Sequence, residues 1–294
     1  MFYRRKIILS LLQAFEGHLP KTSLQKLLFL FAHQQTKPDY DFVPYKYGCY
    51  SFSAKADFTA MVKHGQLSED EQGYTKTDST DYIKFLRESD KQVLIGLKKS
   101  FSSIDTNALV KWTYLHHPYY AIHSTIAQDI LTEEAYRKVL LAKPTHDQTV
   151  LYTIGYEGVS LEVYLNKLIK NDVKVLVDVR NNPLSMKFGF SKTQLKTFCS
   201  NLHIEYLHIP EVGIQSVQRQ ALHTQADYDT LFDLYKAQNL PNTLSQQEQI
   251  LALLKEKKRI ALTCFEANIC QCHRKHLAEA ITQLPKWNYE LKHL

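Results

Sequence analysis

The sequence predicts a small three-layer α/β domain with a parallel sheet, preceded by a mainly helical domain. Two apolar, β-rich runs support the α/β class: residues 150–155, which end on a glycine, and residues 173–179. Between the two runs, residues 161–168 carry apolar side chains at helical spacing. The order strand, helix, strand predicts a βαβ unit of a parallel sheet. Ligands of such sheets bind beyond the carboxyl ends of the strands.

The rest of this domain alternates in the same way, which predicts about four parallel strands. A polar insertion over residues 211–225 interrupts the alternation. The helix that begins at Cys272 is expected to close the fold. The other predicted elements are helices at 160–170, 192–201, 226–238 and 245–256, strands at 204–210 and 259–265, and a loop at 181–191.

The N-terminal domain is predicted to resemble a winged helix. A first helix covers residues 5–16, Ser23 caps a second one, and a third extends from Ala54 to His64. The segment from Tyr74 to Asp78 is expected to form a strand of the wing. The aperiodic stretch AKPTHDQT marks the linker, which gives domains at 1–146 and 147–294. Such modules bind DNA or connect proteins.

Composition narrows the class of protein. Hydrophobic residues make up 44% of the 294, and no apolar run approaches the roughly 20 residues that a membrane helix needs. The net charge of +6 favours an anionic partner, and we expect DNA, held by Lys46, Tyr47 and Lys55. The five cysteines do not resemble a disulfide framework, so a cytoplasmic location is expected. The oligomeric state does not follow from these features.

Polar side chains stand at the predicted carboxyl ends of the strands. Tyr156 and Glu157 follow the first strand, where the tyrosine can stack on a nucleobase and the glutamate can act as a base. Asp178 and Arg180 end the second strand two residues apart, so they share a face, either over a site or as a structural ion pair. His208 ends the third strand. We expect Asp178, Glu157, Glu266 and His208 to be catalytic.

A cluster of cysteines follows the last predicted strand. Cys264, Cys270, Cys272 and His273 are the candidate zinc ligands, but their spacing lacks the paired CxxC of structural zinc sites. We therefore expect no metal or other cofactor, and keep these four residues as the alternative. A thiolate at a helix N-terminus is a further alternative. Otherwise Glu266, His273 and Arg274 line a substrate pocket, with Arg274 on an anion.

Five phrases, YTIGYEG, LVDVRNNPLS, GFSK, IEYLHIPEVGI and LTCFEANICQCHR, occur in this order over about residues 150–285. Together they resemble the family known as Domain of Unknown Function 488. The resemblance implies the fold and a site, rather than a reaction. The expected substrate-binding residues are Tyr156, Gly158, Arg180, Pro183, Ser185, Lys187, His273 and Arg274. Met186 stands where the family often has arginine, so Lys187 compensates or the substrate differs.

These features predict an enzyme that acts on nucleic acid. Four short parallel strands with polar carboxyl ends are analogous to the architecture of uracil-DNA glycosylases, although none of their sequence motifs is present. We therefore expect hydrolysis of an N-glycosidic bond that excises a modified base from DNA, as in defence against phage. The alternative is a metal- or thiol-dependent sensor with the winged helix as its output.

Overall fold

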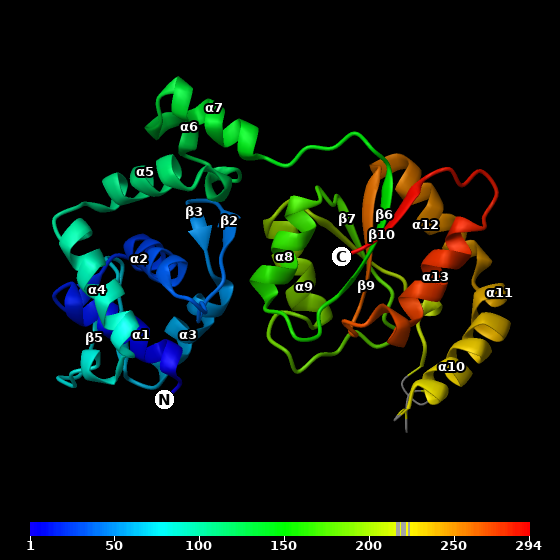
Figure 1. Cartoon of the computed structure of the whole chain (residues 1–294), viewed down its shortest axis with the longest axis horizontal. Helices are drawn as coiled ribbons and strands as arrows, with labels where there is room; N and C mark the ends of the chain where they lie inside the picture. The colour runs from blue at the N-terminus through cyan, green and yellow to red at the C-terminus, as the bar shows by residue number, and fades with distance from the viewer. Residues whose placement is uncertain (216–217, 219–221, 223) are drawn as a thin grey trace. The chain divides into compact units, whose positions relative to one another are not determined.

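The computed structural model describes residues 1–215, 218, 222 and 224–294, so part of the polar insertion at 211–225 lies outside it. The chain divides into two compact units, Met1–Lys143 and Pro144–Leu294 (Figure 1). The division therefore falls three residues before the predicted start of the second domain at residue 147. None of the helices in the described part of the chain is long and apolar enough to cross a membrane.

The N-terminal unit is mainly helical and contains two small antiparallel sheets. Strands β1, β5 and β4 form one sheet, in the order β1-β5-β4, and β2 and β3 form a hairpin. The β1-β5-β4 sheet thus combines a strand after the first helix with a hairpin after the third, and the winged-helix assignment stays a prediction. Its elements are α1 (Tyr3–Ala14), β1 (His18–Leu19), α2 (Lys21–Gln34), β2 (Val43–Tyr45), β3 (Gly48–Tyr50), α3 (Phe52–Lys63), β4 (Leu67–Glu69), β5 (Tyr74–Lys76), α4 (Glu88–Phe101), α5 (Thr106–His116), α6 (Ala127–Ile130) and α7 (Glu133–Ala142).

Helix α2 begins three residues earlier than predicted. It starts at Lys21 after Pro20, so Ser23 lies inside the helix and is not its cap. The Ser23 hydroxyl instead hydrogen-bonds the hydroxyl of Thr106 at the start of α5, at 2.8 Å. Proline explains the earlier start, because its fixed φ suits the entry to a helix and it has no N–H to leave unsatisfied.

The C-terminal unit is a three-layer α/β domain, as predicted. Its five strands are all parallel, in the order β10-β6-β9-β7-β8. Figure 1 shows α8 and α9 on one side of this sheet and α12 and α13 on the other. The elements are β6 (Val150–Gly155), α8 (Leu161–Lys170), β7 (Val175–Asp178), α9 (Lys192–Asn201), β8 (Glu205–His208), α10 (Gln225–Leu234), α11 (Leu240–Asn242), α12 (Leu244–Lys257), β9 (Arg259–Cys264), α13 (His273–Thr282) and β10 (Glu290–His293).

Strand β10 was not predicted, since α13 was expected to close the fold. It pairs with β6 at the edge of the sheet, and its side chains are half-buried or exposed. A segment that is charged and exposed lacks the apolar signal of a buried strand. Backbone pairing with the buried strand β6 therefore holds it in place.

Side chains at the carboxyl ends of β7 and β9 point to both faces of the sheet. Asp178 of β7 is level with Thr263 of β9. The Thr263 hydroxyl accepts a hydrogen bond from Tyr164 of α8, at 2.7 Å, so this pair faces the α8 and α9 layer. Cys264, the next residue, points the opposite way and packs in the core formed with α12 and α13.

Candidate active site

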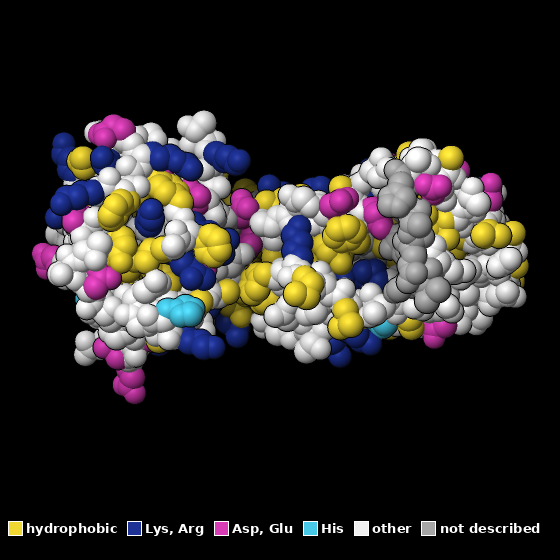
Figure 2. Space-filling view, turned by 90° about the horizontal axis from the view of Figure 1, so that it is seen from below, with side chains coloured by type: hydrophobic (Ala, Val, Ile, Leu, Met, Phe, Trp, Pro, Cys, Tyr) yellow, Lys and Arg dark blue, Asp and Glu magenta, His cyan; other side chains and the backbone are white. Residues whose placement is uncertain are grey.

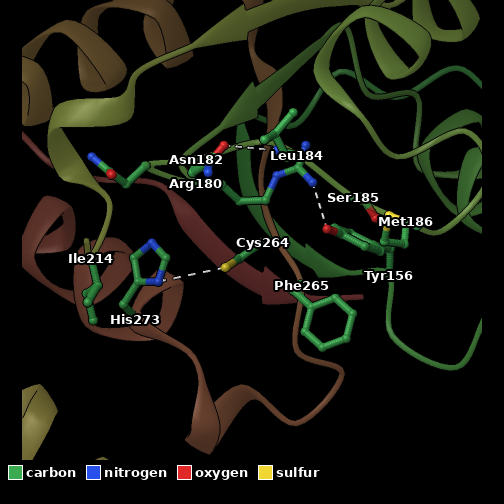
Figure 3. Close-up of a pocket in the computed structure, with 11 residues that line it drawn as sticks. Tyr156, Arg180, Asn182, Leu184, Ser185, Met186, Ile214, Cys264, Phe265 and His273 are labelled. Atoms are coloured by element: carbon green, nitrogen blue, oxygen red, sulfur yellow. Dashed lines mark hydrogen bonds between the residues drawn. The ribbon is translucent and has the colours of Figure 1, made fainter. Parts of the chain in front are cut away.

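A cavity of about 330 Å³ lies at the carboxyl ends of the strands of the C-terminal unit. This is the position that the βαβ pattern predicts for a ligand. Figure 3 shows Arg180 and Tyr156 on one side of it, His273 on the other, and Cys264 between them. The cavity is lined by Tyr156, Arg180, Asn181, Asn182, Leu184, Ser185, Met186, Ile214, Cys264, Phe265 and His273.

Arg180 is held at the cavity wall by Asp178. The guanidinium donates from Nε to Oδ1 at 2.8 Å and from Nη2 to Oδ2 at 2.5 Å, a bidentate ion pair. Asp178 is fully buried, and its Oδ2 also accepts a hydrogen bond from the Tyr206 hydroxyl at 2.5 Å. The carboxylate therefore does not reach the cavity, which corrects the expectation that Asp178 faces a substrate. Its position suits it to orienting Arg180.

Arg180 has further partners on the same side. Its Nη1 donates to the Tyr156 hydroxyl at 2.6 Å and to the Phe190 carbonyl at 2.9 Å. The Tyr156 ring stacks on Phe190 with ring centroids 4.2 Å apart. Burial lowers the pKa of Arg180, but the hydrogen bonds and charge of Asp178 outweigh burial, so the net shift is upward and the guanidinium stays charged.

The loop after β6 is tied to its surroundings by Glu157 and Lys187. Glu157 accepts a hydrogen bond from the Ala267 N–H at 3.0 Å, and the Lys187 ammonium donates to the Tyr156 carbonyl at 2.6 Å. Neither side chain lines the cavity. Burial lowers the pKa of Lys187, with the charge of Glu157 opposing the shift.

The opposite side of the cavity carries a thiol and imidazole cluster. The Cys264 sulfur lies 3.7 Å from His273 Nδ1 and donates to Glu266 Oε2 at 3.2 Å. One ligand atom each from Cys264, Cys272 and His273 lies within 4.8 Å of the other two, and all three residues are buried. Burial raises the pKa of the Cys272 thiol well above its ordinary value, and contact with Cys264 adds to this shift. Cys270 is exposed and is not part of the group.

Arg274 and His208 serve as supports away from the cavity. Arg274 is 2% exposed, and its Nη1 donates to the Glu266 carbonyl at 2.5 Å, so it holds the loop after β9 instead of an anion. His208 Nε2 donates to the Arg180 carbonyl at 2.9 Å, while Nδ1 accepts from Lys192 Nζ at 2.9 Å. Neither residue lines the cavity, contrary to the roles expected for them.

The sequence therefore located the cavity but only part of its lining. Tyr156, Arg180, Ser185, Cys264 and His273 line it, whereas the expected site residues Gly158, Pro183 and Glu266 do not. Sequence reasoning missed Asn181, Asn182, Leu184, Met186, Ile214 and Phe265. Position alone could have identified the two asparagines and Phe265, because Phe265 directly follows β9 and the asparagines come within four residues of the end of β7.

All five cysteines of the sequence are described by the structure, and none of them forms a disulfide, as expected. In the N-terminal unit, Lys46 and Tyr47 form the turn between β2 and β3, where Tyr47 is 53% exposed. Lys55 on α3 pairs with Glu69 at 3.3 Å and donates to the Tyr74 hydroxyl at 2.6 Å. On the face in Figure 2, basic and hydrophobic side chains lie intermixed over this unit. Binding of DNA by these residues stays a prediction.

Residues 160–281 match the family model described as Domain of unknown function DUF488. The C-terminal unit is a DUF488 domain. The match begins after β6, so it is shorter than the predicted extent of about residues 150–285, and the first quoted phrase precedes it. No curated protein and no solved structure matches the chain. The DUF488 domain of this chain thus has a defined cavity, and its reaction must be inferred from the residues there.

Proposed function

We propose that the DUF488 domain is a DNA N-glycosylase-type hydrolase that takes a single, flipped nucleotide into the cavity at the ends of β6, β7 and β9. One observation supports the proposal, namely the composition of this cavity of about 330 Å³. Its lining combines the guanidinium of Arg180, the amides of Asn181 and Asn182 and an aromatic ring, and apolar side chains are exposed at its wall. Enzymes that act on a base extrude it from the stack and read its edge in such a pocket.

The lining suits a planar, hydrogen-bonding ligand. Arg180 supplies a charged donor, and the side chains of Asn181 and Asn182 supply both donors and acceptors, as recognition of a base edge requires. Phe265 is 42% exposed at the cavity, so its ring is available for stacking. The lining contains no Asp or Glu among the residues that the structure describes.

Two exposed apolar residues support action on duplex DNA. Leu184 is 78% exposed and Met186 is fully exposed, and both lie in the cavity wall on the loop after β7. Exposed apolar side chains of this size carry a hydration cost unless they pack on a partner. Proteins that open a base step often insert such a wedge, so we assign Leu184 and Met186 to the space that the flipped nucleotide leaves.

In the proposed reaction, the bond from C1′ to the base breaks and the oxygen of water bonds to C1′, while the proton that the water loses is taken up by the departing base, so that the products are the free base and an abasic site. A carboxylate near C1′ stabilises the oxocarbenium-like transition state. We assign this role to Glu266, which does not line the cavity itself but accepts a hydrogen bond from the lining thiol of Cys264 at 3.2 Å, so its charge acts from directly behind the cavity wall. Asp178 acts through Arg180, as a positioning residue.

The test is incubation of the full-length protein with duplex oligonucleotides that carry ordinary or modified bases, followed by alkali to cleave at abasic sites. Glu266→Gln should lower the rate at which abasic sites form by about 10²-fold or more. Glu248→Gln, on the exposed face of α12, is the matched control and should leave the rate unchanged. The proposal would be contradicted if none of the oligonucleotides were cleaved, or if the Glu266→Gln variant kept full activity.

A sensor is the second candidate, and the thiol and imidazole cluster is the observation that favours it. A metal- or thiol-dependent regulator would bind DNA through the N-terminal unit and change its affinity when the cluster changes state. Binding of DNA without release of any base, together with an affinity that depends on added zinc or oxidant, would favour this function over hydrolysis.

A further inference from the structure

The cluster of Cys264, Cys272 and His273 is assembled from two neighbouring elements. Cys264 is the last residue of β9, Cys272 is the N-cap of α13, and His273 is the first residue of that helix. Their side chains converge although the chain between them makes an excursion of seven residues, 265–271. Two thiols and an imidazole within 4.8 Å of one another form a set of three soft and borderline donors.

The spacing fits ligands around one small ion. Zinc binds sulfur at about 2.3 Å and imidazole nitrogen at about 2.0–2.1 Å in tetrahedral geometry, which places those two ligand atoms about 3.6 Å apart. The Cys264 sulfur and His273 Nδ1 are 3.7 Å apart. The two atoms therefore need little movement to become two ligands of one ion.

The imidazole is already oriented as a ligand. His273 Nε2 lies 3.1 Å from the Val179 carbonyl oxygen, an acceptor, so Nε2 carries the proton and donates it. Nδ1 then carries a lone pair, and this nitrogen is the one that the dashed line in Figure 3 joins to Cys264. A hydrogen bond from the second ring nitrogen to a backbone carbonyl is the usual support of a metal-bound histidine.

We propose that Cys264, Cys272 and His273 bind one zinc ion, with a fourth coordination position that faces the cavity. Sulfur and imidazole donors select zinc over magnesium or calcium, which prefer oxygen. Glu266 contacts Cys264 but is not part of the group of three, so the protein supplies three ligands. Cys264 and His273 line the cavity, which leaves the remaining position open to water or a ligand there.

This inference goes beyond the proposed function, because metal binding is measured without any DNA. Protein purified without chelator and protein reconstituted with zinc should each contain one zinc per chain. Cobalt(II) in place of zinc should give the d–d absorption of a tetrahedral site together with a thiolate-to-cobalt charge-transfer band. Cys272→Ser and His273→Gln should each weaken cobalt binding by at least about tenfold, since even the loss of a group that only hydrogen-bonds a metal ligand costs that much.

Two cysteines outside the cluster provide matched controls. Cys270→Ser removes an exposed thiol and Cys199→Ser a buried one on α9, and both variants should keep the cobalt spectrum. If the Cys272→Ser variant does not fold, a second measurement can be made on the wild-type protein. X-ray absorption of the zinc form should show two sulfur neighbours and at least one nitrogen neighbour.

The proposal is overturned if the folded wild-type protein binds no stoichiometric zinc or cobalt, or if its bound zinc has no sulfur neighbours. Retention of the charge-transfer band by folded Cys272→Ser and His273→Gln, or its loss in Cys270→Ser, would overturn it as well. The cluster would then be a group of two thiols and an imidazole that binds no metal.

Discussion

Two polar clusters flank the same cavity, from opposite faces of one sheet. On the face toward α8 and α9, Asp178 and Arg180 form a buried ion pair whose atoms are engaged by Tyr206, Tyr156 and the Phe190 carbonyl. On the face toward α12 and α13, two thiols and an imidazole converge with one ligand atom of each within 4.8 Å of the other two. The first cluster is an ion pair closed by its own hydrogen bonds, whereas the second brings together three side chains of the kinds that bind zinc.

This difference assigns the two clusters different tasks. A buried carboxylate that is fully hydrogen-bonded fixes its partner guanidinium but has little capacity left for a substrate. Sulfur and imidazole donors that converge can instead bind one ion together. The comparison therefore predicts that a change of Asp178 acts on folding, and that changes in the second cluster act on ligand binding.

The largest expected effect is that of Asp178→Asn. It leaves the Arg180 guanidinium, 6% exposed, without a countercharge, so the free energy of unfolding should fall by about 3–5 kcal/mol. Urea unfolding followed by circular dichroism measures the change. Asp172→Asn is the matched control, because Asp172 pairs with Lys174 at the surface and should contribute at most about 1 kcal/mol. If Asp178→Asn lowered the free energy of unfolding no more than Asp172→Asn does, the structural role of Asp178 would be contradicted.

Zinc should stabilise the protein by a smaller amount. At a free zinc concentration about 100-fold above Kd, binding to the folded state alone adds about 2.7 kcal/mol to the free energy of unfolding. Cys272→Ser should lose this gain. Asp178→Asn, although less stable, should keep it, because Asp178 lies on the other face of the sheet. Equal loss of the zinc effect in both variants would break the comparison between the clusters.

The smallest expected effect concerns the apolar wall between the clusters. Leu184→Ala removes three carbon atoms from the proposed wedge, a loss of up to about 2.4 kcal/mol at about 0.8 kcal/mol for each buried carbon. The rate of base release should therefore fall on duplex oligonucleotides and stay nearly unchanged on single strands. Leu244→Ala, at a 49% exposed leucine of α12, should leave both rates unaltered. Equal losses on duplex and single strands would argue against a wedge.

The sequence predicted most of the sheet because its buried strands are continuous apolar runs with a glycine or polar residue at the end. It missed β10, whose charged side chains reveal nothing of its pairing with β6. At the site, periodicity showed that Asp178 and Arg180 share a face, but not that the carboxylate is enclosed by Tyr206 from the next strand. The approach of Cys272 to Cys264 depends on the loop between β9 and α13, which has no helical or strand periodicity. The sequence therefore could not show that Cys272 belongs to the cluster and that Cys270 does not.

The measurement that tests the account most directly is a crystal structure of the full chain grown with zinc, with diffraction recorded on both sides of the zinc absorption edge. The account predicts a strong anomalous peak bonded to Cys264 Sγ, Cys272 Sγ and His273 Nδ1, and no peak at Asp178. A zinc ion held by Cys270 instead, or a fully ordered cluster with no anomalous signal between its members, would contradict it.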